Sequence, residues 1–322
     1  MTTTVAAASW VIDRVEVLGI HRLSPSFVRL ELGGPCLAEV GTDGPTYDQR
    51  IKLVLPPPGG RVPPVPASAE WYAAWRALPR GQRGHLRTYT IRDLRGVGEQ
   101  ARLVVDVVVH AAGDGTGHGT GHGPGCAWAA GARVGDQVVL VGPRRGHPSG
   151  GIEFAPGTAT RVLLAGDETA VPAVAAILEQ LPASMTGAAF LEVPDPADVQ
   201  TVRHPAGVDV TWLPRGSTAH GALLHVAVLG HLGVRPGGAA GGSGSADDVD
   251  PDLWETPTYS SSGEDLDVPA PLGADHADLY AWIAGESGVV TGLRRVLVRQ
   301  LGMDRRRVAF MGYWRRGVAM PS

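Results

Sequence analysis

The hydrophobic period of this 322-residue chain changes near Arg161, and this change constrains the fold more than any other feature. Before Arg161, short segments alternate apolar and polar residues, as half-buried strands do, with almost no helical period between them. From Arg161 onward, an apolar strand of the fully buried type leads into a helical pattern. The chain is long enough for two domains, so we expect an all-β domain over about residues 10–150 and an α/β domain over about residues 160–317.

The first domain is predicted to be a small antiparallel barrel, because its strands are short and are separated by turn residues. Three prolines, for example, follow the strand that ends at Leu55. The predicted strands cover residues 10–18, 27–32, 49–55, 85–92, 101–110 and 136–141.

The second domain begins with a strand, a turn and a helix whose N-terminus could face a nucleotide. The strand covers residues 161–165, and the helix covers residues 170–181 with Pro172 tolerated in its first turn. Asp167 or Thr169, in the turn between them, can cap the helix. Further strands are predicted at residues 188–193, 208–213, 279–284 and 307–311, and a further helix at residues 289–301.

Two stretches are predicted to lack regular structure. Residues 237–275 are Gly/Ser-rich, then acidic and proline-punctuated, and we expect a flexible insertion with no assigned chemistry. Residues 112–125 form a glycine-rich loop that contains His118 and His122. So many glycines will not hold a helix, so the four-residue spacing of these histidines does not indicate a metal site, and we predict no bound metal. A flexible flap and a tolerated insertion both remain open for this loop.

Composition excludes several classes of protein. The formal net charge is −4 at pH 7, which gives no indication of a nucleic-acid-binding surface. The two cysteines, Cys36 and Cys126, lie in different contexts, which argues against a disulfide framework, a zinc site or an iron–sulfur cluster. No charged N-terminal region precedes an apolar run, and no apolar stretch reaches about 18 residues. We therefore expect a cytoplasmic protein without membrane insertion.

The predicted strand at residues 85–92 carries the most specific chemistry. Arg87 and Tyr89 share one face of it, because side chains two residues apart point the same way. The cation can bind a pyrophosphate, the phenol ring can stack on a heterocycle, and the hydroxyl of Thr90 can reach a ring nitrogen. This combination suits a flat, phosphorylated cofactor, although a strand with arginines on its surface face is an alternative.

The sequence Arg-x-Tyr-Thr-Ile-Arg at residues 87–92 resembles the flavin-binding signature of the siderophore-interacting proteins, which are FAD-dependent ferric-siderophore reductases of the ferredoxin-reductase superfamily. Three further stretches resemble the same family in the same order, at residues 166–172, 284–288 and 312–317. The resemblance implies an N-terminal antiparallel FAD-binding β-barrel followed by a doubly wound α/β nicotinamide-nucleotide-binding domain.

The resemblance also extends the predicted FAD site beyond Arg87, Tyr89 and Thr90. It implies that His110 ends a strand beside the flavin, and that the turn at Gly125 and Cys126 offers backbone N–H groups to the pyrophosphate. It implies a second positive charge at Arg144. A capped structural histidine, a small filler cysteine and a surface arginine are the respective alternatives. Lys52 is a candidate for contacting an anionic substrate, or an ordinary solvated strand lysine.

In the second domain, the resemblance assigns the Gly-Glu turn at residues 285–286 to the nicotinamide side. With the turn after the first strand of this domain, whose helix could face a nucleotide, this makes Asp167, Glu168, Thr169 and Glu286 candidate cofactor-binding residues. Tyr313 and Trp314 would cover the flavin or gate nicotinamide access, or would simply anchor the C-terminal segment. Arg215 could hold a 2′-phosphate, although a surface charge is the stronger alternative.

The implied activity is hydride transfer from NADPH or NADH to FAD, followed by one-electron reduction of a ferric siderophore and release of Fe²⁺. No catalytic acid or base is needed. A flavin or quinone reductase on the same scaffold and a non-catalytic siderophore-binding protein are the alternatives. Whether NADH, NADPH or reduced ferredoxin is the donor, and which siderophore is reduced, stay open; a monomer is the working expectation.

Overall fold

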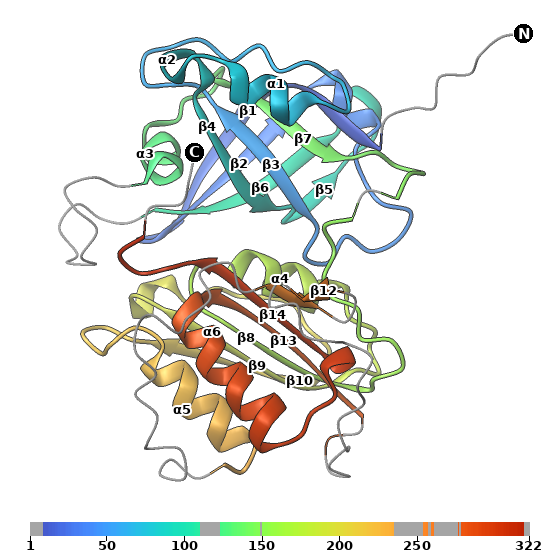
Figure 1. Cartoon of the computed structure of the whole chain (residues 1–322), viewed down its shortest axis with the longest axis vertical. Helices are drawn as coiled ribbons and strands as arrows, with labels where there is room; N and C mark the ends of the chain where they lie inside the picture. Colours follow the sequence, from blue (N-terminus) through green and yellow to red (C-terminus); the bar gives the residue numbers. More distant parts are fainter. Residues whose placement is uncertain are drawn as a thin grey trace, which may run out of the picture. The chain divides into compact units, whose positions relative to one another are not determined.

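The computed structural model describes residues 9–109, 123–148, 150–234, 254–256, 259–260, 276 and 278–318. Its contacts divide the chain into two compact units (Figure 1), a first unit whose last main segment ends at Ile152 and a second unit whose main segment begins at Glu153. The first unit contains an antiparallel sheet, and the second contains a largely parallel sheet with helices. The predicted fold class, an antiparallel β domain followed by an α/β domain, is therefore confirmed.

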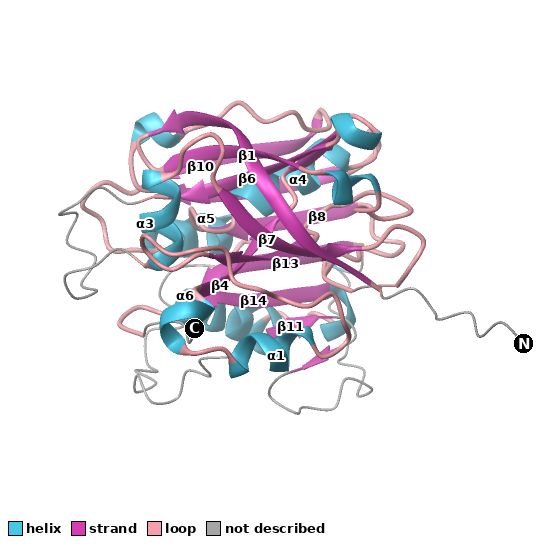
Figure 2. Cartoon of the chain, turned by 90° about the horizontal axis from the view of Figure 1, so that it is seen from above, coloured by secondary structure: helices cyan, strands magenta, loops and turns pink. Residues whose placement is uncertain are grey.

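Seven antiparallel strands form the sheet of the first unit, in the order β4-β3-β7-β1-β2-β6-β5; Figure 2 draws strands in magenta. Each predicted alternating segment forms one of them, because alternation places every second side chain in a core. The strands are β1 (Trp10–Ser24), β2 (Phe27–Gly33), β3 (Arg50–Leu55), β4 (His85–Thr90), β5 (Asp93–Arg95), β6 (Arg102–Val108) and β7 (Gln137–Pro143).

One bent segment joins the two edges of this sheet. β4 pairs with β3 at one edge, and β5 pairs with β6 at the other, yet only two residues separate β4 from β5. Ile91 N donates to Gln49 O beside β3, and Arg92 N donates to Val104 O of β6. Because the backbone passes directly from one edge to the other, the sheet closes into a barrel, with β4 and β5 together acting as a sixth strand.

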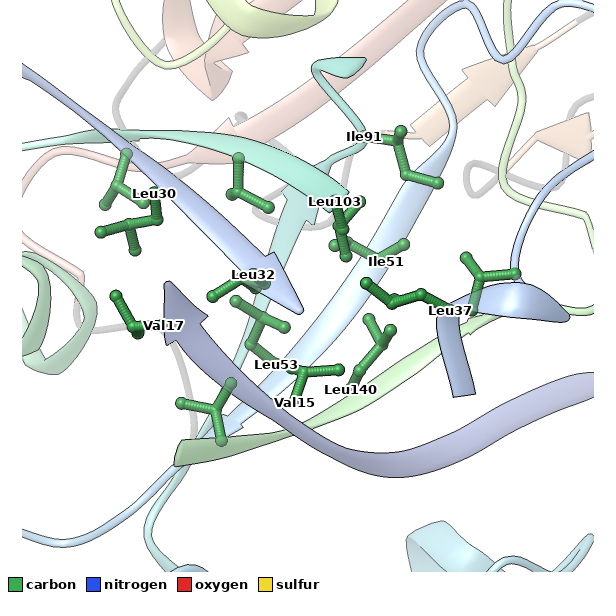
Figure 3. Packing of buried hydrophobic residues seen from close by; sticks show 14 of the residues in the cluster. Val15, Val17, Leu30, Leu32, Leu37, Ile51, Leu53, Ile91, Leu103 and Leu140 are labelled. Atoms are coloured by element: carbon green, nitrogen blue, oxygen red, sulfur yellow. The ribbon is translucent and has the colours of Figure 1, made fainter. Parts of the chain in front are cut away.

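The barrel interior is filled by branched aliphatic side chains (Figure 3). They come from alternate positions of the strands and from Leu37 in the short 3₁₀-helix Pro35–Ala38. Burial of such a side chain contributes roughly 1.5–3 kcal/mol, so the alternating pattern both specifies and stabilises the barrel. The labelled residues are Val15, Val17, Leu30, Leu32, Leu37, Ile51, Leu53, Ile91, Leu103 and Leu140.

Three short helices accompany the barrel, and the first two were not predicted. They are α1 (Trp71–Ala77), α2 (Arg80–Arg83) and α3 (Pro124–Gly131), and a 3₁₀ turn covers Gly98–Gln100. Trp75 of α1 is 1% exposed and packs in a second apolar cluster with Val54 and Val139. Its indole Nε1 donates to Arg83 O at 2.9 Å. A single buried tryptophan thus holds α1, a segment too short to show a helical period in the sequence.

The sheet of the second unit has the order β10-β9-β8-β13-β14-β11-β12. β10, β9, β8, β13 and β14 run parallel. The side chains of β8, β9, β13 and the first half of β14 are largely buried, as their continuous apolar runs predicted, whereas β10, at the edge, is mostly exposed or half-buried. The strands are β8 (Arg161–Gly166), β9 (Thr186–Val193), β10 (Gly207–Pro214), β11 (Trp254–Thr256), β12 (Tyr259–Ser260), β13 (Leu279–Glu286) and β14 (Val308–Trp314).

The parallel strands follow the order third, second, first, fourth, fifth in the chain, so the direction of the connections reverses between β8 and β13. In open α/β sheets, ligands bind outside the carboxyl ends of the strands at such a reversal. α5 (Ala222–His231) and α6 (Ser287–Arg294) share one apolar cluster with the sheet, while α4 (Val171–Gln180) packs against β8. α5 was not predicted, and α6 continues as a π-helical stretch over Arg295–Gln300. Short 3₁₀ turns cover Pro196–Asp198 and Arg305–Arg307.

Part of the predicted insertion at residues 237–275 has regular structure. β11 pairs antiparallel with β14, and β12 pairs with β11, so the edge of the second sheet includes two short strands that the polar composition did not predict. The rest of that insertion, apart from these strands, lies outside the described residues, as does nearly all of the loop at residues 112–125. No helix within the described ranges is long and apolar enough to cross a membrane.

Candidate functional site

The face of β4 that carries Arg87 and Tyr89 lies against the start of α3. Arg87 pairs with Leu53 and Tyr89 with Ile51, and both partners belong to the barrel core, so this face of the strand turns toward the interior. A Cβ atom built on Gly125, in the first turn of α3, would lie 2.6 Å from the Tyr89 hydroxyl and 3.5 Å from Arg87 Cγ. Arg87, Tyr89 and the turn at Gly125 are therefore brought together.

Arg87 has no carboxylate partner among the described residues. Its Nη1 donates to Leu86 O at 2.7 Å, and its side chain is half-buried. Burial lowers the pKa of the Arg87 guanidinium and raises the pKa of the Tyr89 phenol, although Arg87 opposes the second shift. A partly buried cation without an anion is costly unless something supplies the missing charge, so this position favours an anionic ligand.

Thr90 and Lys52 lie on the opposite face of the sheet. Lys52 pairs with Thr88, and its Nζ donates to Thr88 Oγ1 at 2.8 Å. Thr90, two residues further along the strand, is buried and shares that face. Burial, and then the nearby Arg50, lower the pKa of Lys52. The register therefore separates Lys52 and the Thr90 hydroxyl from Arg87 and Tyr89.

The other arginines near the predicted motif are neutralised internally. Arg92 lies 3.5 Å from Asp106, which also accepts two hydrogen bonds from Arg29, so the last residue of the motif holds the barrel together. Arg144 forms an ion pair with the Glu39 carboxylate. Arg144 is thus not a free second cation, and its contact with FAD stays a prediction. Cys126 is half-buried against the barrel core, and His110 lies outside the described residues.

In the second unit, the buried carboxylate of Asp167 connects three strand ends. Its Oδ1 accepts from Thr169 N at 2.9 Å and from the Thr169 hydroxyl, which closes the turn after β8. Its Oδ2 accepts from Glu286 N at 2.8 Å and from Trp314 Nε1 at 2.9 Å. A Cβ at Gly285 would lie 2.6 Å from Oδ2, so the Gly-Glu turn needs glycine for this close approach. Asp167 therefore brings four predicted site residues together, itself included.

Glu286 caps helix α6 rather than leaving its carboxylate free. Its Oε2 accepts from Val289 N at 3.0 Å, and its Oε1 accepts from Arg316 N at 3.2 Å. These bonds fix the start of α6 and the segment after β14. Tyr313 packs edge-on against Trp282, with ring centroids 6.4 Å apart.

Glu168 and Arg215 form a buried bidentate ion pair beside Asp167. Arg215 Nη1 and Nη2 donate to the two Glu168 oxygens at 2.7 and 2.8 Å, and the side chains are 9% and 2% exposed. Glu192, at the end of β9, lies 3.9 Å from Arg215 and accepts from Gly221 N at 2.6 Å and from Leu224 N at 3.1 Å. Its carboxylate thereby holds the start of α5.

His220 completes this network, and the sequence did not indicate it. Its Nε2 lies 3.4 Å from Asp167 and 3.7 Å from Glu168, and its ring packs edge-on against Trp314 at 5.1 Å between centroids. Burial alone would lower the pKa of His220, but the contacts with both carboxylates raise it to about 10. Burial alone would raise the pKa of Glu168, but His220 and Arg215 lower it to about 2. The two carboxylates therefore favour the protonated form of His220.

The carboxylates of Asp167 and Glu168 and a nitrogen of His220 lie within 4.8 Å of one another, which is close enough for a metal-ligand set. The donor chemistry favours protons instead. Both oxygens of Glu168 already accept from the Arg215 guanidinium, and the two carboxylates favour a proton on His220, with which a metal would have to compete for the lone pair. We interpret this group as an internal ion-pair network at the carboxyl edge of the sheet.

The fold is similar to that of a ferredoxin reductase. The ferredoxin reductase of carbazole 1,9a-dioxygenase is 14% identical, with a TM-score of 0.52, and the match covers 96% of this chain and 71% of that one. The family described as siderophore-interacting FAD-binding domain matches residues 16–147, and the family described as siderophore-interacting protein matches residues 159–317. The chain belongs to the siderophore-interacting protein family.

Individual relatives agree with this assignment. A siderophore utilization protein from T. fusca is 28% identical with a TM-score of 0.66, and the match covers 99% of this chain and 98% of that one. The siderophore-interacting protein SipS from Aeromonas hydrophila is 28% identical with a TM-score of 0.61, over 95% and 92% of the two chains. Ferric vibriobactin reductase ViuB of Vibrio cholerae is 32% identical over 231 residues, 72% of this chain. An uncharacterized protein of Mycobacterium tuberculosis is 35% identical over 210 residues. Each of these two matches spans 65% of the length of the relative.

Proposed function

We propose that this protein binds FAD in its barrel and uses NADH or NADPH to reduce ferric siderophores in the cytoplasm, which releases Fe²⁺. The observation that carries the proposal is Arg87, a half-buried cation with no carboxylate partner among the described residues. It lies beside Tyr89 and the glycine-opened start of α3, where a side chain would fill the space. The match to a siderophore-interacting FAD-binding domain over the same residues supports this site.

The residues of the barrel fit FAD by charge and by space. Arg87 would bind the pyrophosphate, and the backbone N–H groups at Gly125 and Cys126 would approach it from the start of α3. The Tyr89 ring would contact the flavin. The Thr90 hydroxyl, on the opposite face of β4, would have to reach a ring nitrogen around the end of the strand. Bound FAD would supply the exchange between two-electron and one-electron chemistry, and the protein would hold it in place.

The second unit would bind the nicotinamide nucleotide at the reversal between β8 and β13. Asp167 accepts hydrogen bonds from Glu286 N and Trp314 Nε1, so these three residues would lie at the carboxyl ends of the strands beneath the nucleotide. A hydride carries two electrons, and each ferric ion accepts one. One NADH or NADPH therefore reduces two ferric complexes and leaves one proton.

Ferric siderophores are the proposed acceptor because Fe²⁺ binds hard oxygen ligands far more weakly than Fe³⁺, so reduction releases the metal with the chelator intact. The relative from Vibrio cholerae is named a ferric vibriobactin reductase, which supports this choice. Lys52 is the proposed contact for an anionic complex, and it would act from the face opposite Arg87.

The first test is Arg87→Ala, which we expect to weaken FAD binding by roughly 1–3 kcal/mol, the cost of a lost charge-assisted hydrogen bond. Flavin retained after dialysis is read from its visible absorbance. Arg95→Ala is a matched control, because Arg95 is an exposed arginine of the same barrel that pairs with Asp93. Unchanged occupancy in Arg87→Ala would remove Arg87 from the site.

The second test concerns the acceptor. The FAD-loaded protein is reduced anaerobically with NADH or NADPH and then mixed with ferric siderophores or quinones while flavin reoxidation is followed. We expect rapid reoxidation by ferric siderophores. Rapid reoxidation by quinones alone would instead assign the protein to quinone reduction, and protein that cannot take up FAD would indicate a non-catalytic siderophore-binding protein.

A further inference from the structure

Arg215 follows β10 directly, at the carboxyl edge of the sheet, where doubly wound domains bind nucleotides. In such domains an arginine accommodates the 2′-phosphate of the phosphorylated dinucleotide, whereas an acidic side chain binds the free 2′-hydroxyl of the other. The state of the Arg215 guanidinium therefore bears on which donor the edge accepts.

That guanidinium is already satisfied. Its two terminal nitrogens donate to both oxygens of Glu168, in the planar fork that a phosphate would otherwise use. Both side chains are more than nine-tenths buried, and Glu192 lies on the same guanidinium at 3.9 Å. A 2′-phosphate would have to displace Glu168, which would leave a buried carboxylate without its partner.

The charge around the pair also opposes a phosphate. Among the residues described at this edge, the carboxylates of Asp167, Glu168 and Glu192 face the cations of Arg215 and His220. The network therefore has a negative balance even with His220 protonated. A doubly charged phosphate would meet repulsion there, whereas a free 2′-hydroxyl carries no charge to be repelled.

We infer that Glu168 determines donor specificity: by occupying Arg215, it makes the edge select NADH and reject the 2′-phosphate of NADPH. The inference rests on the proposed function only in taking a nicotinamide nucleotide as the donor. Glu168 acts here through Arg215, so it is a specificity-determining residue with no part in the transfer of the hydride.

The test compares Glu168→Gln with the unmodified protein. Glutamine keeps the size of the side chain but removes its negative charge. At least one N–H group of Arg215 then lacks a carboxylate acceptor and can donate to a phosphate, and the network carries one negative charge fewer. Isothermal titration with adenosine 2′,5′-bisphosphate and with 5′-AMP measures the preference for the 2′-phosphate without any redox chemistry. We expect the unmodified protein to favour 5′-AMP, and Glu168→Gln to shift the ratio of affinities toward the bisphosphate by about tenfold.

Two further variants identify the cause. Glu168→Gln combined with Arg215→Gln should lose the gain, because the phosphate then has no guanidinium to bind. Glu179→Gln is the matched control, since it removes a carboxylate from the last turn of α4 that lies 3.9 Å from the exposed Arg203. We expect it to leave the ratio unchanged. If Glu168→Gln proves unfolded, Arg215→Gln alone decides, because a fall in bisphosphate affinity would show that Arg215 reads the phosphate natively.

Reduction of bound FAD by NADH and by NADPH separates the two proposals. If neither nucleotide reduces the flavin, the proposed donor is wrong, while the titrations still test Arg215 and Glu168. The inference is overturned if the unmodified protein prefers the bisphosphate, if Glu168→Gln shows no shift, or if neither adenosine nucleotide binds any variant.

Discussion

The two units treat buried charge in opposite ways. In the barrel, Arg87 is half-buried with no carboxylate partner among the described residues, next to a turn kept open by Gly125. At the edge of the second sheet, Asp167, Glu168 and His220 neutralise one another and Arg215. The comparison teaches that a buried cation without a protein counter-ion indicates a bound anionic ligand. A network whose charges are paired with one another indicates a scaffold that positions the backbone around a ligand site without contacting the ligand through those charges.

The largest effect is expected from Asp167→Ala in the second unit. The change leaves Glu286 N and Trp314 Nε1 without their acceptor and removes an anion from beside His220. Breaking a buried charged network by removing one partner costs about 3–5 kcal/mol, so the free energy of unfolding should fall by that amount. Chemical denaturation followed by circular dichroism measures it. A loss below about 1 kcal/mol would show that the network does not hold the strand ends together.

The next effect is a pH dependence that comes from His220. A pKa raised from 6.5 to about 10 means that protonation of His220 stabilises the fold fully below pH 6.5, and that this contribution is lost as the pH rises toward 10. Its size at neutral pH is on the order of a few kcal/mol. The stability difference between the unmodified protein and His220→Gln should therefore shrink between pH 6 and pH 10.

The control for that measurement is His21→Gln, because His21 is an exposed histidine of the barrel. This variant measures how much the loss of an exposed histidine changes stability over the same range. A pH-independent difference for His220→Gln would mean that the imidazole is neutral in the network.

Gly125→Ala tests the proposed FAD site of the barrel, where Arg87 has no carboxylate partner among the described residues. The new Cβ would lie 2.6 Å from the Tyr89 hydroxyl, so the ring must shift out of the space proposed for the flavin. We expect FAD binding to weaken by about 1–3 kcal/mol, the usual cost of overpacking. Gly131→Ala, at the other end of α3, has nothing within 4 Å of the new atom and should bind FAD normally. Equal FAD affinities in the two variants would place the cofactor elsewhere.

The smallest effect is expected from Arg144→Ala. Glu39 already neutralises Arg144, so its loss should weaken FAD binding by less than about 1 kcal/mol, the range of a partly exposed ion pair. The same dialysis assay as for Arg87→Ala measures it. A loss as large as that of Arg87→Ala would show that Arg144 leaves Glu39 to bind FAD.

The longer strands of both units were predictable because burial leaves a periodic trace in the sequence, whereas the short strands β5, β11 and β12 were not predicted. The predicted segments at residues 27–32 and 161–165 match β2 and β8 to within a residue at either end. α1 left no such trace, since one tryptophan, Trp75, holds it in place. The period also places Arg87 and Tyr89 on one face of β4, but only the pairing with Leu53 and Ile51 shows that this face turns inward.

The contacts of the second unit were largely unpredictable for a different reason. Asp167 and Trp314 are 147 residues apart, and nothing in either segment indicates that an indole will donate to that carboxylate. His220 and Glu192 each lie in unremarkable surroundings in the sequence. Their shared position at the carboxyl ends of parallel strands is the one signal that could have found them, and it requires the strand order first.

The bent segment through Ile91 and Arg92 has a consequence for how the barrel can fail. Open sheets end in strands whose unpaired backbone can recruit another chain, which is a common start of aggregation. Here the two terminal strands are one piece of backbone, so fraying at the seam cannot release either of them independently. The segment that carries the proposed cofactor contacts therefore also protects the barrel against edge-to-edge association, and damage there would reduce the solubility of the barrel together with its binding of FAD.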